Sequence, residues 1–135
     1  MTARPRPAVT EDTAFYWEGA ARGELLLQRC SACGTLRHPP TPGCPSCRGL
    51  TWDPTAAVGR GVVYSFVVLH PPLVPGVDTG TVVAVVELDE GPRVVTNVVE
   101  TTPDDVRVGL PVELCFESLG DGAVLPQFRP AAPTS

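Results

Sequence analysis

The second half of the chain carries short apolar runs separated by glycine, proline and acidic residues, a pattern typical of β-strands and turns. The longest run, residues 62–70, alternates between two faces. One face carries Val62, Tyr64, Phe66, Val68 and His70, and the other carries Val63, Ser65, Val67 and Leu69. Because both faces are largely apolar, we expect the outside of this strand to be covered as well as the inside.

Further runs complete the predicted sheet at residues 81–88, 93–100, 111–117 and 123–128. Residues 89–92 form a turn that pairs the first two of these runs as a hairpin. Thr102-Pro103-Asp104-Asp105 has the cap, the proline and the acidic residues of a single helical turn. Three strands, a helical turn and two strands predict a five-stranded Greek-key barrel of the OB type. The loop of residues 70–80 joins the first two strands, and we expect it to line a binding face.

The first half of the chain predicts a helix over residues 13–22, ending near Gly23. Its aromatic residues Phe15, Tyr16 and Trp17 are consecutive, and at about 100° per residue they spread over most of the helix circumference. A single apolar stripe cannot bury all three. They therefore either pack against the ribbon and the following strands or dock into a partner subunit.

Strands over residues 24–29, 35–38 and 50–58 are expected to form a small sheet around two cysteine pairs. After them, Gly59-Arg60-Gly61 predicts a bulge or a sharp bend. The fold class is therefore mainly β. We divide the chain into a flexible lead-in (1–12), the N-terminal helix and ribbon (13–57), the OB-fold barrel (58–128) and a disordered tail (129–135).

Residues 30–47 contain two Cys-x-x-Cys pairs, Cys30 with Cys33 and Cys44 with Cys47. The two-residue spacing lets the chain reverse so that both sulfurs face one ion, and two such turns supply a tetrahedral shell of four thiolates. Because protein ligands fill every position, we predict one structural zinc ion per chain in a rubredoxin-like ribbon. Iron also fits four thiolates, whereas a redox motif normally uses one pair. His38 lies between the pairs and is not needed as a ligand.

Cysteine usage and charge limit the function classes. The chain has five cysteines, an odd number, and no apolar signal segment at its N-terminus, so disulfides are not expected. Fifteen acidic residues against ten basic ones, all of them arginine, give a formal net charge of −5, which argues against electrostatic binding of nucleic acid. Because no run of about 18 apolar residues occurs, we expect a cytoplasmic protein that does not span a membrane.

Two residues are candidates for catalysis, His70 and Cys115. The sequence has no Gly-x-Ser-x-Gly elbow, no Gly-rich phosphate loop and no second histidine near a candidate nucleophile. Alternation puts Cys115 on the face of Glu113 and Glu117, and acidic neighbours disfavour a thiolate. We therefore predict that the chain has no catalytic residue of its own.

Further segments, together with the cysteine pairs, form a recognisable series along residues 11–130. They are Phe15-Tyr16-Trp17-Glu18-Gly19, Leu25-Leu26-Leu27-Gln28-Arg29-Cys30, Gly59-Arg60-Gly61-Val62-Val63-Tyr64-Ser65-Phe66, Val85-Val86-Glu87-Leu88-Asp89-Glu90-Gly91-Pro92-Arg93, Val108-Gly109-Leu110-Pro111-Val112 and Leu125-Pro126-Gln127-Phe128-Arg129-Pro130. In order and combination this series resembles the DUF35 family, whose members are acyl-CoA-associated proteins with a zinc ribbon and an OB fold. All four ribbon cysteines, which some relatives lack, are present here.

The resemblance implies an accessory role. Members of the family accompany thiolase-like enzymes, and some are fused to or partnered with hot-dog-fold enoyl-CoA hydratases, including systems that shorten steroid side chains through a thiolase-like aldolase. By resemblance, this chain is a non-catalytic subunit of a hetero-oligomer that binds a thiolase-like enzyme, stabilises it and helps to enclose its acyl-CoA. The resemblance leaves open whether docking uses the aromatic helix, the ribbon or the exposed barrel face. Phe15, Tyr16 and Trp17 are then candidates for partner binding, and Arg60, Arg93 and His70 for the ligand-facing side.

Two other functions stay open at this point. A zinc ribbon joined to an OB fold is also found in nucleic-acid-binding modules, although the acidic net charge disfavours that alternative. An independent CoA-ester enzyme would have to use His70 or Cys115.

Overall fold

The computed structural model describes residues 7–71, 79–120 and 123–131. Most of the predicted 70–80 loop, the start of the predicted lead-in, part of the turn before the last strand and most of the predicted tail lie outside the described residues. Helix α1 (Ala14–Ala21) lies within the predicted range of 13–22. Gly19 lets this helix approach the next strand closely, because a Cβ there would lie 2.6 Å from the side chain of Leu26.

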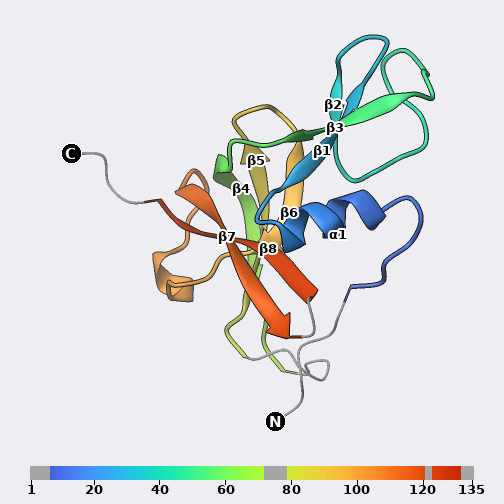
Figure 1. Ribbon diagram of the computed structural model, residues 1–135. Coiled ribbons are helices and arrows are strands. Elements are labelled where there is room, and N and C mark those ends of the chain that lie inside the picture. The colour runs from blue at the N-terminus through green and yellow to red at the C-terminus, as the bar shows by residue number, and fades with distance from the viewer. Residues whose placement is uncertain (1–6, 72–78, 121–122, 132–135) are drawn as a thin grey trace.

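The ribbon is a small antiparallel sheet of three strands, β1 (Leu26–Cys30), β2 (Leu36–Arg37) and β3 (Trp52–Ala56), in the order β2-β1-β3. Strand β1 is central because it pairs with both neighbours. The sheet stands at one end of the molecule, above α1 in Figure 1. It therefore holds both cysteine pairs at the end of the structure away from the end of β7 and the start of β8.

The second sheet contains β4 (Arg60–Val68), β5 (Val82–Leu88), β6 (Arg93–Asn97), β7 (Pro111–Gly120) and β8 (Ala123–Pro130), in the order β6-β5-β4-β7-β8. A short 3-10 turn, η1 (Pro103–Asp105), separates β6 from β7, as predicted. The sheet curls so that β8 returns towards β6, where Val98 and Phe128 form a parallel bridge. This arrangement is the predicted OB-type fold.

No continuous ladder closes the sheet between β6 and β8 within the described residues. A side chain contributes to the seam instead: Oε1 of Gln127 accepts hydrogen bonds from the backbone N–H of Asn97 (3.2 Å) and from the hydroxyl of Thr96 (3.4 Å). The Thr96 hydroxyl also lies 3.3 Å from the carbonyl of Pro126, and one backbone bond joins the N–H of Val99 to the carbonyl of Phe128 (2.8 Å). The barrel is therefore loose at this seam, and the amide of Gln127 replaces part of the missing ladder.

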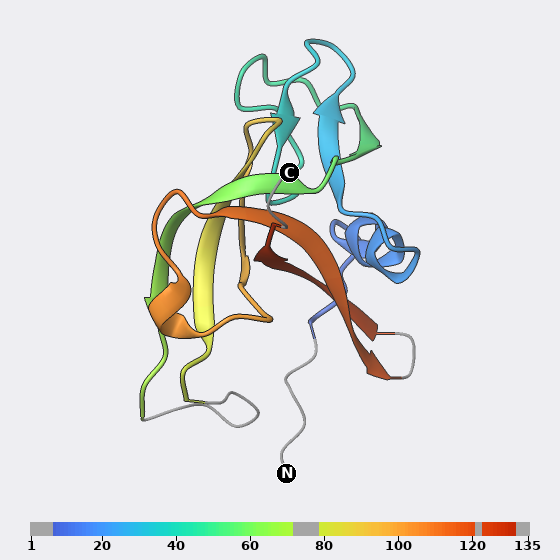
Figure 2. The same ribbon diagram turned by 90° about the vertical axis from the view of Figure 1, so that its left-hand side faces the viewer.

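The ribbon, the helix and the barrel share one hydrophobic core. Leu25 and Leu27, at the start of the ribbon, are fully buried together with Phe128, Val63 and Val86 of the barrel. Helix α1 packs against β8 and β1. In Figure 2 the helix accordingly lies beside β8, on the side of the barrel away from β4 and β5. Because apolar burial couples these parts, they are expected to unfold together.

The alternation predicted for residues 62–70 is wrong beyond Val63. In the pairing of β4 with β5, Val63 lies opposite Val86 and Ser65 lies opposite Val85, which leaves Tyr64 as an extra residue in a bulge. The extra residue reverses the pattern, so Tyr64 and Ser65 are both exposed while Phe66 and Val68 pack against the core. The bulge therefore falls later than the predicted Gly59-Arg60-Gly61 segment. Gly61 instead lets β4 lie very close to β5, since a Cβ at this position would collide with the carbonyl oxygen of Glu87.

Candidate metal centre and binding surfaces

The two cysteine pairs meet at one point in the ribbon. The sulfurs of Cys30, Cys33, Cys44 and Cys47 all lie within 4.8 Å of one another. The Sγ atoms of Cys30 and Cys47 are 3.5 Å apart, and those of Cys33 and Cys44 are 3.6 Å apart. A tetrahedral ion at about 2.3 Å from each sulfur requires sulfurs about 3.8 Å apart. The four thiols therefore fit a structural zinc ion, and they are too far apart for disulfide bonds.

In each knuckle, backbone N–H groups favour the thiolate of the first cysteine. The backbone N–H of Cys33 lowers the pKa of Cys30. In the second knuckle the N–H groups of Cys47 and Ser46 lower the pKa of Cys44 to about 6. A thiol must lose its proton before it binds a metal ion, so these bonds favour zinc binding at Cys30 and Cys44. At Cys47 the N–H of Gly49 acts in the same direction, but the neighbouring sulfurs and burial outweigh it and raise the pKa to about 12.

The two knuckles have the same shape but different residues at the position after the second cysteine. Gly34 occupies this position in the first knuckle with φ of 78°, and Arg48 occupies it in the second with φ of 65°. Glycine adopts this left-handed conformation freely, whereas arginine is strained there. Gly49 leaves room for the site, because a Cβ there would lie 3.2 Å from the sulfur of Cys47, a tight contact.

The aromatic side chains of α1 pack largely against other residues of the same chain. Tyr16 is only 8% exposed and belongs to the core, and burial raises its pKa to about 12. Phe15 packs against Trp52 with ring centroids 4.5 Å apart, and Trp17 lies edge-on to Tyr16. Tyr16 therefore presents almost no surface to a partner in this structure, and Phe15 and Trp17 present only part of theirs.

His38 completes this aromatic cluster instead of joining the metal site. Its ring lies 5.3 Å from that of Tyr16, and burial lowers its pKa. A neutral imidazole packed against an aromatic ring fits the prediction that His38 is not a ligand.

The three residues predicted for the ligand-facing side do not come together. Arg60 begins β4, and Arg93 lies two strands away near the same end of the sheet, opposite Glu87. His70 follows the other end of β4, about 30 Å away along the strand. All three are exposed. The sequence placed them correctly at strand ends, but sequence alone does not show that the ends are opposite.

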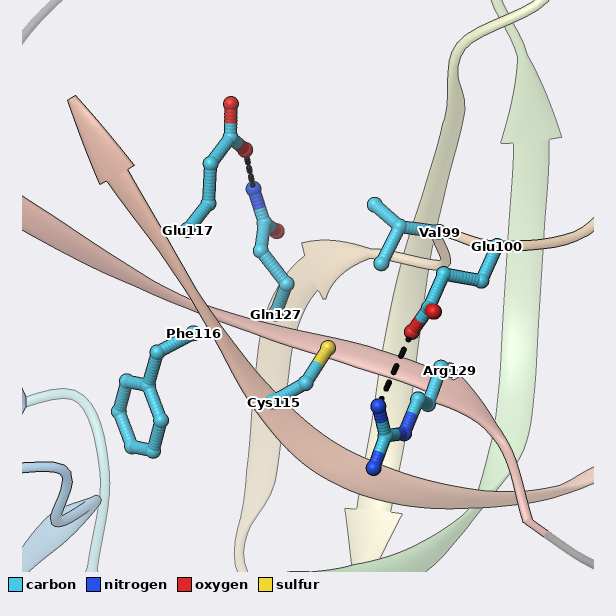
Figure 3. A pocket seen from close by; sticks show the side chains of 7 residues that line it. All are labelled: Val99, Glu100, Cys115, Phe116, Glu117, Gln127 and Arg129. Atoms are coloured by element: carbon cyan, nitrogen blue, oxygen red, sulfur yellow. Dashed lines mark hydrogen bonds and ion pairs between the residues drawn. The ribbon is translucent and has the colours of Figure 1, made fainter.

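Cys115 lies in a pocket of about 510 Å³ that sequence reasoning missed. The pocket is formed by β7, β8 and residues 99–100, and Figure 3 shows Arg129 reaching Glu100 and Gln127 reaching Glu117. Arg129 also binds Glu113 at 3.0 Å. The positive charge of Arg129 is therefore already paired with two carboxylates of the chain, Glu100 and Glu113.

Burial is the largest cause that raises the pKa of Cys115, and Glu100, Glu113 and Glu117 raise it further against the opposing effect of Arg129. The thiol is therefore protonated at neutral pH, which is its poorly nucleophilic form. The acidic neighbours expected from the sequence are present, although desolvation contributes more than they do.

Across the described ranges, no helix has the length and the apolar character needed to cross a membrane.

Fold and site together define a class: a rubredoxin-like zinc ribbon with a closed set of four cysteines, built onto an OB-fold domain. Residues 17–53 match the family described as "ChsH2, rubredoxin-like zinc ribbon domain", and residues 55–117 match "ChsH2, C-terminal OB-fold domain". The chain belongs to the DUF35 family. The resemblance seen in the sequence, the predicted fold class and the zinc ribbon are thereby confirmed.

Three relatives illustrate the range of the family. The chain is 49% identical over 130 residues to a "Probable enoyl-CoA hydratase alpha subunit" of Thermomonospora curvata, covering 96% of this chain and 41% of the relative. It is 40% identical over 119 residues to the "3-oxo-4,17-pregnadiene-20-carboxyl-CoA hydratase alpha subunit" of Mycobacterium tuberculosis, covering 88% and 38%. It is 34% identical over 114 residues to a "DUF35 domain-containing scaffold protein" of Methanocaldococcus jannaschii, covering 78% and 81%. The chain therefore spans about two fifths of the two hydratase subunits and most of the scaffold protein.

A solved structure matches over nearly the whole chain. The structure described as "Ltp2-ChsH2(DUF35) aldolase" contains a chain that is 48% identical, with a TM-score of 0.88, covering 94% of this chain and all of that one.

Proposed function

We propose that this chain is a non-catalytic accessory subunit or domain that binds a thiolase-like acyl-CoA enzyme. In this role it stabilises the enzyme and helps to enclose the acyl-CoA. The observation that carries the proposal is the match to the DUF35 chain of the Ltp2-ChsH2 aldolase, at 48% identity over the full length of that chain. At this identity the surfaces that contact a partner are expected to be retained together with the fold.

The chemistry of the chain agrees with an accessory role. Four thiolates fill the coordination shell of a zinc ion, so the metal has no open position for water or substrate. Cys115 is protonated at neutral pH and faces carboxylates. The archaeal relatives of similar size are also named scaffold proteins.

Arginine side chains are the candidates for contact with the phosphates of CoA in the assembled complex, because guanidinium groups bind phosphate through paired hydrogen bonds. Arg60 is exposed at the start of β4. Arg93 is about half exposed and lies in an ion pair with Glu87, so it would have to exchange one anion for another. Arg60 is therefore the better candidate of the two.

Co-purification with the Ltp2 subunit tests the proposal. Tagged Ltp2 and this chain are expressed together and separated by size-exclusion chromatography with light scattering. We expect a complex of fixed stoichiometry, aldolase turnover by the complex and none by this chain alone. Failure of the wild-type chain to associate with Ltp2, or turnover by the isolated chain, contradicts the proposal.

A hydratase complex is a second candidate, and the names of the two hydratase alpha subunits favour it. In that case the partner would include a hot-dog-fold enoyl-CoA hydratase, and the steroid CoA ester of the mycobacterial relative indicates the class of substrate. The same co-purification with a hydratase beta subunit distinguishes the two complexes. A nucleic-acid-binding module is a further alternative, and salt-sensitive binding of single-stranded DNA or RNA would support it.

A further inference from the structure

The outer face of β4, β5 and β6 is apolar and exposed. The register brings side chains of the three strands into rows, with Val67 opposite Val83 and Val85 opposite Val95. Val95 is 71% exposed and Val67 is 58% exposed. We call these four valines, with Tyr64 at their border, the valine face. Most large apolar residues of a folded protein are covered, so a grouped set on one sheet face indicates a contact surface.

The valine face is hollowed. A depression of about 190 Å³ lies over β4, β5 and β6, and its lining includes all four valines. The depression is lined mainly by apolar atoms, and its polar lining includes Ser65, which lies opposite Val85. A hollow of this kind suits one bulky apolar side chain, which is how the strongest contacts of protein interfaces are commonly built.

Tyr64 is held in place at the border of the valine face. The guanidinium of Arg93 lies over its ring, 3.8 Å from the centroid, and Nε of Arg93 is 3.2 Å from a carboxylate oxygen of Glu87. The β4 bulge is what turns the Tyr64 side chain outward next to the valines. Tyrosine and arginine are the residues that contribute most often to binding energy at interfaces.

The charge of this face selects among possible partners. Glu87 and Arg93 are the charged residues among these rows, and they pair with each other, so the face is neutral in a chain of net charge −5. An apolar protein surface can cover it without leaving a buried unpaired charge. Phosphate groups of a nucleic acid or a lipid bilayer would find no free cation within this patch.

We propose that the valine face is the docking surface for the thiolase-like subunit, with an apolar side chain of that subunit seated in the hollow. The proposal rests on the accessory function proposed above. It assigns docking to β4, β5 and β6 instead of to the aromatic residues of α1, because Tyr16 is buried and α1 lies on the other side of the barrel (Figure 2).

The test measures binding of purified Ltp2 by Val95→Asp, Val67→Asp and a matched control, Val108→Asp. Val108 is 66% exposed and lies between η1 and β7, outside the valine face. We expect Val95→Asp to weaken binding at least about 30-fold, the effect of losing one strong interface contact, and Val108→Asp to change binding less than about threefold. Thermal unfolding is measured for each variant, and little change is expected because all three sites are exposed.

Each result has a separate meaning. If wild-type chain binds Ltp2 and Val95→Asp and Val67→Asp bind equally well, docking at the valine face is wrong while the accessory function stands. If Val108→Asp weakens binding as much as Val95→Asp, the effect is one of added charge, and the site assignment is again overturned. Self-association of the wild type that Val95→Asp abolishes, with Ltp2 binding intact, would make the face a contact between two copies of this chain. If wild type does not bind Ltp2, the accessory function itself fails.

Discussion

Replacing Cys33 by serine is the most direct test of the metal centre. The Cys33 sulfur is one of four that converge within 4.8 Å, and a serine hydroxyl does not ionise at neutral pH to replace it. Structural zinc contributes about 10–16 kcal/mol of apparent binding free energy in small zinc domains. An equal share for each of four ligands is about 3 kcal/mol, so the variant should bind zinc at least about 100-fold more weakly.

The loss should reach the barrel because the core is shared. Leu25 and Leu27, on either side of the start of β1, are fully buried against barrel residues. Full burial of one leucine stabilises a fold by about 1.5–3 kcal/mol, so release of both would cost about 3–6 kcal/mol. A domain of this size has only about 5–15 kcal/mol of net stability. We therefore expect a large fall in melting temperature, in a single transition.

The assay combines zinc content by mass spectrometry, competition with a chromogenic chelator and thermal unfolding. Cys115→Ser is the matched control, since it makes the same chemical change outside the metal site. Wild type and Cys115→Ser should carry one zinc per chain. A Cys33→Ser variant with full zinc content, unchanged resistance to the chelator and an unchanged melting temperature would refute the assignment.

Three other outcomes are expected. Arg48→Gly should stabilise the zinc-loaded chain by about 1 kcal/mol, because glycine relieves the backbone strain of a left-handed φ of 65°. The variant should therefore have a higher melting temperature than wild type, and a lower melting temperature would contradict the strain. Burial raises the pKa of Tyr16 to about 12. The stability that comes from the protonated Tyr16 hydroxyl is therefore complete below pH 10, and about 2 kcal/mol of it is lost between about pH 10 and pH 12. Denaturant unfolding of wild type should show this loss, and Tyr16→Phe should not. Gln127→Leu should cost about 1–3 kcal/mol in denaturant unfolding, because it leaves the N–H of Asn97 without the side-chain acceptor, and an unchanged stability would show that the bridge is dispensable.

The parts of the structure that short-range chemistry determines could be predicted from the sequence. Two-residue spacing brings each cysteine pair together whatever the rest of the chain does, and the strand pattern with its turns predicted the OB topology. The β4 bulge could not be predicted. Tyr64 is as suitable for an inward position as Phe66, and only the pairing with β5 decides which of them faces the core.

Long-range packing explains the other differences. The sequence left open whether the aromatic residues of α1 pack internally or meet a partner, and the nearby ring of Trp52 and the shared core account for much of their surface. The ligand-facing group of Arg60, Arg93 and His70 could not be judged without the length and direction of β4. The pocket around Cys115 forms because residues 99–100 lie beside β8, and no local sequence pattern indicates this contact.

The side-chain seam between β6 and β8 has a consequence for motion. Amide hydrogen exchange reports local openings, which occur most easily where few backbone hydrogen bonds must break. At this seam the side-chain amide of Gln127 and the backbone bond from Val99 supply much of the hydrogen bonding, whereas a full backbone ladder supplies it between β4 and β5. The β7–β8 hairpin should therefore separate from β6 more often than the other strands separate from one another, and the OB domain would adapt its shape along this one line.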